Sequence, residues 1–197
     1  MITSPYVDCD ESEWLSITKK LVDDFPLDND LIVKVVHDAW DDIYTSSFGD
    51  DSIKIGSDIF LPAQATGVIL EKLIAVRLHN ICSNWRGGET KTEKDIVRKD
   101  DNYFSFEIKT SSSNTGLYGN RSTGHRSANR SKHRSGYYLV INYKLPKEDD
   151  KSNEIKKIRF GWIDDDDWKG QAKSTGQQAS IGAALARLKL IIIFPRT

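Results

Sequence analysis

The sequence predicts one α/β domain, with helices gathered in its N-terminal part and strands in the remainder. Its 197 residues suit a single domain that can bury a sizeable core. Apolar residues recur at helical spacing in the first part of the chain, whereas the later apolar runs are rich in β-branched and aromatic residues. We therefore expect one domain over residues 1–197, with a helical subregion over 1–48 and the functional core over 66–197.

Two amphipathic helices are predicted before residue 48. Asp10 and Glu13 form a capping-box pattern, and the apolar face that follows ends at Pro26. The second helix begins near Asp28 and carries apolar residues at a spacing close to that of an α-helix. The apolar surface of this pair either packs in the core or forms a dimer interface, and it includes Trp14, Leu15, Leu21, Ile32, Val36 and Trp40.

A third helix is predicted over residues 66–80, after a segment, 53–61, that is either a short strand or a loop. In this helix Glu71 lies in one stripe with Val68 and Ala75. The carboxylate is therefore either turned inward or, as the alternative, exposed or salt-bridged. The exposed alternative is favoured by a competing apolar face, which consists of Ile69, Leu70, Leu73 and Ile74.

A β-hairpin is predicted over residues 95–109, with a three-residue turn at 100–102. Strand side chains alternate between the two faces of a sheet, and apolar residues such as Phe106 mark the face that points to the core. Glu107 and Lys109 then share the opposite face. The hairpin is therefore expected to present a carboxylate and an ammonium together, away from the core.

Two carboxylates lie opposite each other in this hairpin. The turn places Asp95 across from Glu107, and directly opposed Cβ atoms lie about 4.5–5.5 Å apart. A hard cation such as Mg²⁺ relieves the repulsion between them and keeps positions open for water and a phosphate oxygen. Lys109 can then hold or deprotonate the attacking water. The pattern predicts a Mg²⁺-dependent nuclease site, although an alternating charged strand with a solvated face produces the same pattern by chance.

Charge is segregated along the chain, although the totals, 28 Lys and Arg against 29 Asp and Glu, nearly cancel. No Asp or Glu occurs between Glu107 and Glu148, and residues 110–136 form a long polar loop within that interval. Such a loop is functional or disordered. Its side chains either remain solvated or contact DNA phosphates and bases, and we expect the DNA contacts. The candidates are Arg121, Arg126, Asn129, Arg130, Lys132 and Arg134.

Three strands are predicted in the C-terminal part, over residues 137–145, 155–163 and 187–194. Two polar segments separate the last two strands. The acidic run 164–167 is expected to cap a short helical turn, because carboxylates favour helix N-termini. The turn 175–178 ends in Gln177 and Gln178, which are either solvated or, since Gln can read adenine, in contact with DNA.

The two cysteines, Cys9 and Cys82, lack the spacing of a disulfide scaffold or of a zinc site, so a reducing cytoplasm fits best. The longest apolar stretch, 190–194, is far too short to span a membrane. We therefore expect a cytoplasmic protein that has no membrane partner.

The hairpin resembles the metal site of the PD-(D/E)xK nuclease superfamily. Its pattern is Asp95, eleven residues, Glu107, one residue, Lys109, and Lys94 stands where that family usually has proline. In many members a helix before the hairpin contributes an acidic residue to the site. The resemblance therefore implies a role for Glu71 beside Asp95, Glu107 and Lys109.

Several segments resemble the ScaI-type restriction endonucleases, and together they cover the C-terminal half of the chain. They are residues 107–113, 119–122, 160–164, 167–168 and 175–179. The resemblance implies a mixed β-sheet flanked by helices, a homodimer, and Mg²⁺-dependent cleavage of double-stranded DNA at a short palindrome. It also implies a cognate DNA methyltransferase as functional partner. The alternatives are a structure-selective or repair nuclease of the same superfamily and a DNA-binding protein without catalysis.

Overall fold

The computed structural model describes residues 3–120, 134–171 and 178–196, and a six-stranded sheet forms its centre. The strand order is β11-β8-β7-β5-β4-β3, and every neighbouring pair is antiparallel except β5 and β7. The expected mixed sheet is therefore confirmed. The strands are β3 (Trp85–Gly87), β4 (Ile96–Arg98), β5 (Phe106–Ser111), β7 (Gly136–Lys144), β8 (Glu154–Ile163) and β11 (Leu190–Phe194).

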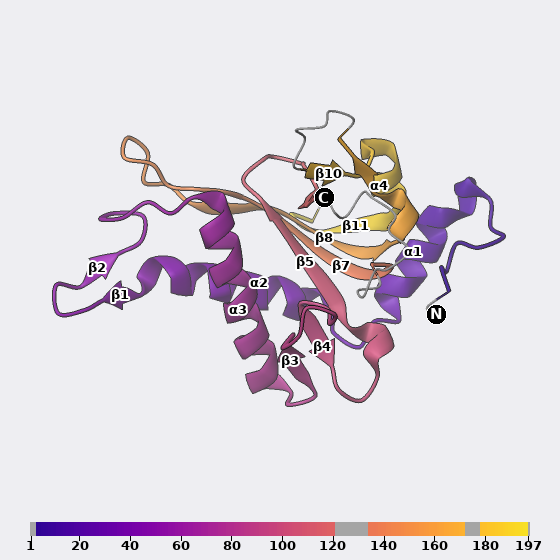
Figure 1. The fold of residues 1–197 in the computed structure, drawn as a ribbon, viewed down its shortest axis with the longest axis horizontal. Helices are drawn as coiled ribbons and strands as arrows, with labels where there is room; N and C mark the ends of the chain where they lie inside the picture. The colour runs from indigo at the N-terminus through magenta and orange to yellow at the C-terminus, as the bar shows by residue number, and fades with distance from the viewer. Residues whose placement is uncertain (1–2, 121–133, 172–177, 197) are drawn as a thin grey trace.

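Three long helices pack against one face of this sheet (Figure 1). They are α1 (Trp14–Asp23), α2 (Asn29–Thr45) and α3 (Ala63–Ile81). The predicted capping box is present at a 3₁₀ turn, Glu11–Glu13, and the side chain of Asp28 caps α2 by accepting from the Asp30 N–H. Among the described residues no helix has the length and apolar character needed to cross a membrane.

The apolar surface of the N-terminal helices is used mainly in the core. Ile32, Val36 and Trp40 are at most 2% exposed and belong to the same cluster as the aromatic residues of β7 and β8. A large aromatic sheet face must be covered, and these helices cover it. For these three residues the alternative of a dimer interface is therefore wrong, whereas Leu15 remains exposed.

The opposite face is covered by a second, smaller sheet (Figure 1), which the sequence did not predict. Its strands are β6 (Tyr118–Asn120), β10 (Gln178–Ser180) and β9 (Lys169–Gly170), and the short helix α4 (Ala183–Lys189) follows it. The segment 110–136 is therefore not structureless in its described part, and Gln178 lies in a strand. The last strand begins only at Leu190, because the preceding Ala, Leu, Arg and Lys residues favour helix.

The hairpin has the predicted register but not the predicted turn. Ile96 pairs with Phe106, which is the register that sets Asp95 opposite Glu107. Instead of a three-residue turn, the connection contains a 3₁₀ helix, Asn102–Phe104. Tyr103 and Phe104 both lie against the ring of Tyr137 in the core, which draws this connection inward.

Two shorter elements complete the fold. A small hairpin, β1 (Ser47–Phe48) and β2 (Ile53–Lys54), precedes α3, so the strand alternative for residues 53–61 holds only at its beginning. The acidic run forms the predicted cap, with Asp164 before a 3₁₀ turn over Asp165–Asp167.

Candidate active site

The hairpin brings Asp95, Glu107 and Lys109 together. The Nζ atom of Lys109 lies 3.2 Å from Oε2 of Glu107 and 3.7 Å from Oδ2 of Asp95. Oδ2 of Asp95 also accepts a hydrogen bond of 2.8 Å from the backbone N–H of Ile108, which holds this carboxylate against β5. The predicted group of two carboxylates and one ammonium is thus present at one place in the fold.

Burial and mutual charge shift the pKa values of Asp95 and Lys109. Burial raises the pKa of Asp95 from 3.8 to about 6; the Lys109 ammonium opposes the shift, and the Glu107 and Glu71 carboxylates add to it. Burial acts to lower the pKa of Lys109, but the charges of Asp95 and Glu107 outweigh it, so that pKa lies above its usual range. The site therefore favours any cation that can contact both carboxylates.

Glu107 was predicted to face solvent, but the structure buries it. Glu107 is only 4% exposed, because the small sheet and its neighbours cover this face of the central sheet. The Lys94 ammonium lies 3.8 Å from Oε1 of Glu107, so this carboxylate lies between two lysines, Lys94 and Lys109. Lys94 is missing from the predicted site, although its place directly before Asp95, where proline is expected, was a signal for it.

Lys94 also connects the site to the end of the basic loop. Its ammonium donates to the backbone carbonyl of Arg134 at 3.4 Å, and the hydroxyl of Tyr138 donates to the same carbonyl at 2.7 Å. Tyr138 is register partner of Glu107 across β5 and β7. Arg134, one of the predicted DNA-binding residues, is therefore attached through its backbone to the surroundings of Glu107.

Glu71 lies beside this group but outside it. A Cβ atom on Gly67 would come within 2.3 Å of Oγ1 of Thr110, so glycine allows α3 to pack closely on the catalytic strand. Glu71, one turn further along α3, pairs with Lys72 at 2.9 Å and lines a cleft of about 740 Å³ together with Lys109. Among the described residues no three Asp, Glu, His or Cys side chains are placed to hold one metal ion.

The predicted stripe of α3 is wrong at Val68, which is 54% exposed. The competing apolar face, through Leu70 and Ile74, packs in the core, together with Ala75 from the predicted stripe. Glu71 therefore agrees with the alternative of a salt-bridged carboxylate, and it sits at the boundary between the buried face and the cleft.

The cleft also receives one predicted DNA-binding residue, Gln178. It is exposed, pairs with Asn120 across the small sheet, and lines the cleft with the segment 110–113. Apart from Arg134, the other predicted DNA-binding residues lie outside the described residues: Arg121, Arg126, Asn129, Arg130, Lys132 and Gln177.

A mixed α/β fold that holds two carboxylates and a lysine beside an open cleft is the arrangement expected of a nuclease. Comparison with known proteins agrees. A family model described as "ScaI restriction endonuclease" matches residues 4–194, and the Type II restriction enzyme ScaI of Streptomyces caespitosus is 35% identical over 192 residues. That match covers 96% of this chain and 84% of the relative. No solved structure matches.

The chain therefore belongs to the ScaI restriction endonuclease family and is a site-specific deoxyribonuclease. The resemblance noted in the sequence is confirmed, and it extends over nearly the whole chain, including the helical N-terminal third that carries none of the motifs. The alternative of a DNA-binding protein without catalysis is wrong.

Proposed function

We propose that the protein is a Mg²⁺-dependent type II restriction endonuclease with a PD-(D/E)xK core, and that it cuts double-stranded DNA at a short palindromic sequence. One observation carries this proposal: oxygens of Asp95 and Glu107 both lie within 4 Å of the same Lys109 nitrogen, at the wall of an open cleft. Family membership supports the DNA substrate.

The residues fit a Mg²⁺ ion. One ammonium already contacts both carboxylates, so one cation placed between them can do the same. The donors are hard oxygens, which Mg²⁺ prefers, and two carboxylates leave most of its coordination to water and phosphate. The raised pKa of Asp95, about 6, reflects a buried site in which a second negative charge is costly and a divalent cation would offset it.

When bound, the metal would neutralise charge on the scissile phosphate and activate a water. The chain itself does the rest. Asp95 and Glu107 hold the ion, and the Ile108 N–H keeps the Asp95 carboxylate oriented. Lys109 holds the attacking water or stabilises charge that develops on the phosphate. In-line attack leaves a 5′-phosphate and a 3′-hydroxyl, and Glu71 acts on the site through its charge from the cleft wall.

We also propose a two-fold homodimer. One hairpin supplies one site that cuts one strand, so a double-strand break at a palindrome needs two copies related by the symmetry of the DNA. The basic loop and Gln178 would contact the substrate, and a cognate methyltransferase would protect the DNA of the host cytoplasm.

Digestion of plasmid DNA tests the proposal. With Mg²⁺ we expect a discrete set of fragments, and with EDTA in place of Mg²⁺ we expect intact plasmid. A smear of products would indicate a nuclease without a short recognition sequence. Uncut plasmid in the presence of Mg²⁺, from protein that still binds the same DNA, would contradict the proposed cofactor.

A further inference from the structure

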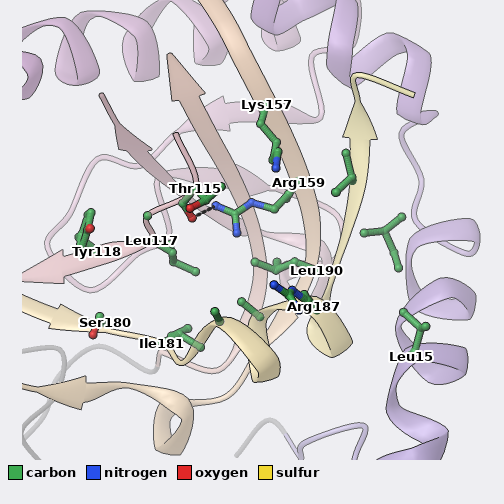
Figure 2. A pocket seen from close by; sticks show the side chains of 15 residues that line it. Leu15, Thr115, Leu117, Tyr118, Lys157, Arg159, Ser180, Ile181, Arg187 and Leu190 are labelled. Carbon is green, nitrogen blue, oxygen red and sulfur yellow. Dashed lines mark hydrogen bonds between the residues drawn. The ribbon is translucent and has the colours of Figure 1, made fainter. Parts of the chain in front are cut away.

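A second cavity, of about 670 Å³, lies between β8, the segment 115–118 and α4 (Figure 2). Leu117 and Leu190 form part of its apolar wall. Its polar side chains are mainly basic. Arg159 is 8% exposed, Lys157 is half-buried and Arg187 is exposed, so the three cations lead from the interior of the cavity to the surface.

The charge of Arg159 is not balanced by a carboxylate in the part of the chain that the structure describes. Its Nη2 donates to the carbonyl of Thr115 at 3.0 Å and to Oδ1 of Asn142 at 2.9 Å, and both acceptors are neutral. Its Nε has no partner among the described residues, and Figure 2 shows the other terminal nitrogen turned away from Thr115 into the cavity. Burial lowers the pKa of this guanidinium.

An uncompensated buried cation is costly, and an anion that enters the cavity would offset the cost. The described residues that line the cavity include no Asp or Glu. In the described part of the chain, no carboxylate lies within 4 Å of the charged group of Lys157 or Arg187. The cavity thus combines three cations, none paired with a carboxylate in the described part of the chain, with an opening to solvent, which is the charge pattern of an anion site.

The cavity opens on the same face of the sheet as the active site. Lys109 pairs with Val140 across β5 and β7, and Val140 pairs with Arg159 across β7 and β8. Register partners point to the same face, so Lys109 and Arg159 stand in one row, two strand spacings or about 10 Å apart. Tyr118 lines both the catalytic cleft and this cavity, which makes them neighbours.

The backbone between the two openings is held in place. Nδ2 of Asn142 donates to the carbonyls of Ser113 at 3.0 Å and Gly116 at 2.9 Å, and the same Asn142 accepts from Arg159. Both the catalytic cleft and the cavity are therefore built on one fixed segment.

We propose that this cavity is a phosphate site, in which Lys157, Arg159 and Arg187 hold a backbone phosphate of the DNA substrate away from the cut position. The proposal rests on the proposed function in so far as the cut phosphate lies at Lys109. A DNA strand carries a phosphate at every nucleotide, so a site about 10 Å from Lys109 is within reach of a phosphate near the cut. Guanidinium groups match phosphate oxygens in geometry and charge.

The test uses the two more exposed cations, whose loss leaves the fold intact. DNA binding is measured in EDTA against salt concentration for Lys157→Ala and Arg187→Ala. Each lost phosphate contact should lower the salt slope by about 0.9, which makes the loss of affinity between 50 and 200 mM salt about 3.5-fold smaller. Lys34→Ala is the control, because Lys34 lies on α2, on the other side of the sheet, and should leave the slope unchanged.

Inorganic phosphate distinguishes the source of the anion. Thermal unfolding of the wild type and of the Lys157→Ala/Arg187→Ala variant is compared in phosphate and in chloride of equal ionic strength. A reduced salt slope supports the DNA phosphate. An unchanged slope overturns the proposal; a phosphate-dependent stabilisation confined to the wild type would then assign the cavity to a small anion. Because binding is measured without Mg²⁺, failure of cleavage cannot imitate either result.

Discussion

Two buried clusters in this protein have the same composition, a lysine between two carboxylates, but different geometry. Lys189 contacts Asp164 at 2.8 Å and Asp167 at 2.8 Å, and it is almost fully buried. In the proposed active site, Lys109 contacts Glu107 at 3.2 Å and Asp95 only at 3.7 Å. The side chain of Lys109 is 24% exposed, against 4% for Lys189.

The difference shows which cluster is closed and which is open. The rings of Tyr6 and Trp14 lie 4.4 and 4.7 Å from the Lys189 ammonium and complete its surroundings, so three hydrogen bonds to the carboxylates satisfy it. The Lys109 cluster borders the cleft, and its longer contacts leave carboxylate oxygens able to take another cation. One cluster stabilises the fold, and the other is available for chemistry.

The largest expected effect is on cleavage. Asp95→Asn or Glu107→Gln should reduce the cleavage rate at least about ten-thousandfold, roughly 5.5 kcal/mol in the barrier, because each removes a proposed metal ligand. Folding should be retained, since the substitution also removes repulsion between the two carboxylates. Single-turnover cleavage measures the rate, and Glu148→Gln, in the exposed turn after β7, should cut like the wild type. Unimpaired cutting by Asp95→Asn would remove this residue from the metal site.

The closed cluster should respond in the opposite way. Lys189→Met leaves Asp164 and Asp167 buried without their cation, which should lower the free energy of unfolding by about 3–5 kcal/mol. Below the new melting temperature, the cleavage rate per folded molecule should stay near that of the wild type. Urea denaturation measures the loss. Lys109→Met is the matched variant: it should lose cleavage, and its loss of stability should be smaller, because the contacts of Lys109 are longer and Lys94 still faces Glu107.

The next largest expected effect is on the pH dependence of stability. The folded pKa of Asp95, about 6, lies above its ordinary value of 3.8, so the folded state binds more protons between these values. Stability of the metal-free protein should therefore fall as pH rises from about 4 to about 6, by up to about 3 kcal/mol. Asp95→Asn should remove the share of Asp95 in this slope and leave that of Asp167, whose pKa burial also raises. A stability profile that is the same in both proteins would contradict the raised pKa.

The smallest effect is expected at Lys94. Lys94→Met removes one hydrogen bond to the Arg134 carbonyl, so DNA binding should weaken by about 1 kcal/mol, roughly fivefold. It also removes a positive charge beside Glu107, so half-maximal cleavage should need less Mg²⁺. Lys94→Arg keeps the charge and should leave the Mg²⁺ requirement unchanged. Equal Mg²⁺ requirements in the wild type and Lys94→Met would show that this lysine acts only on the loop.

The parts of the fold that could be predicted are those written in local patterns. Helical spacing located α1, α2 and most of α3. The alternation of residues 104–109 separated the two faces of the proposed catalytic hairpin, and its register followed from the expected turn at residues 100–102. The small sheet could not be predicted, because it pairs residues 118–120 with residues 178–180, which are short, polar and far apart in the sequence. Because this cover could not be predicted, Glu107 was expected at the surface, whereas the structure buries it.

The same holds for the candidate site: its local contacts could be predicted, and its long-range contacts could not. Asp95, Glu107 and Lys109 follow from one hairpin, so their meeting depends only on local register. Lys94 acts through Arg134, which lies 40 residues away, and no local pattern specifies that contact. Arg159 was overlooked for the same reason, because only the pairing of β5, β7 and β8 shows that it shares a face with Lys109.

The single parallel pair in the central sheet limits how this enzyme can be altered. Because β5 and β7 run in the same direction, the chain cannot join them by a tight turn and must return across the sheet, which takes a dozen or more residues. That return, residues 112–135, contains β6 and the basic segment. Deleting this return down to a short linker would force β7 to reverse, and the sheet that carries Glu107 would be lost.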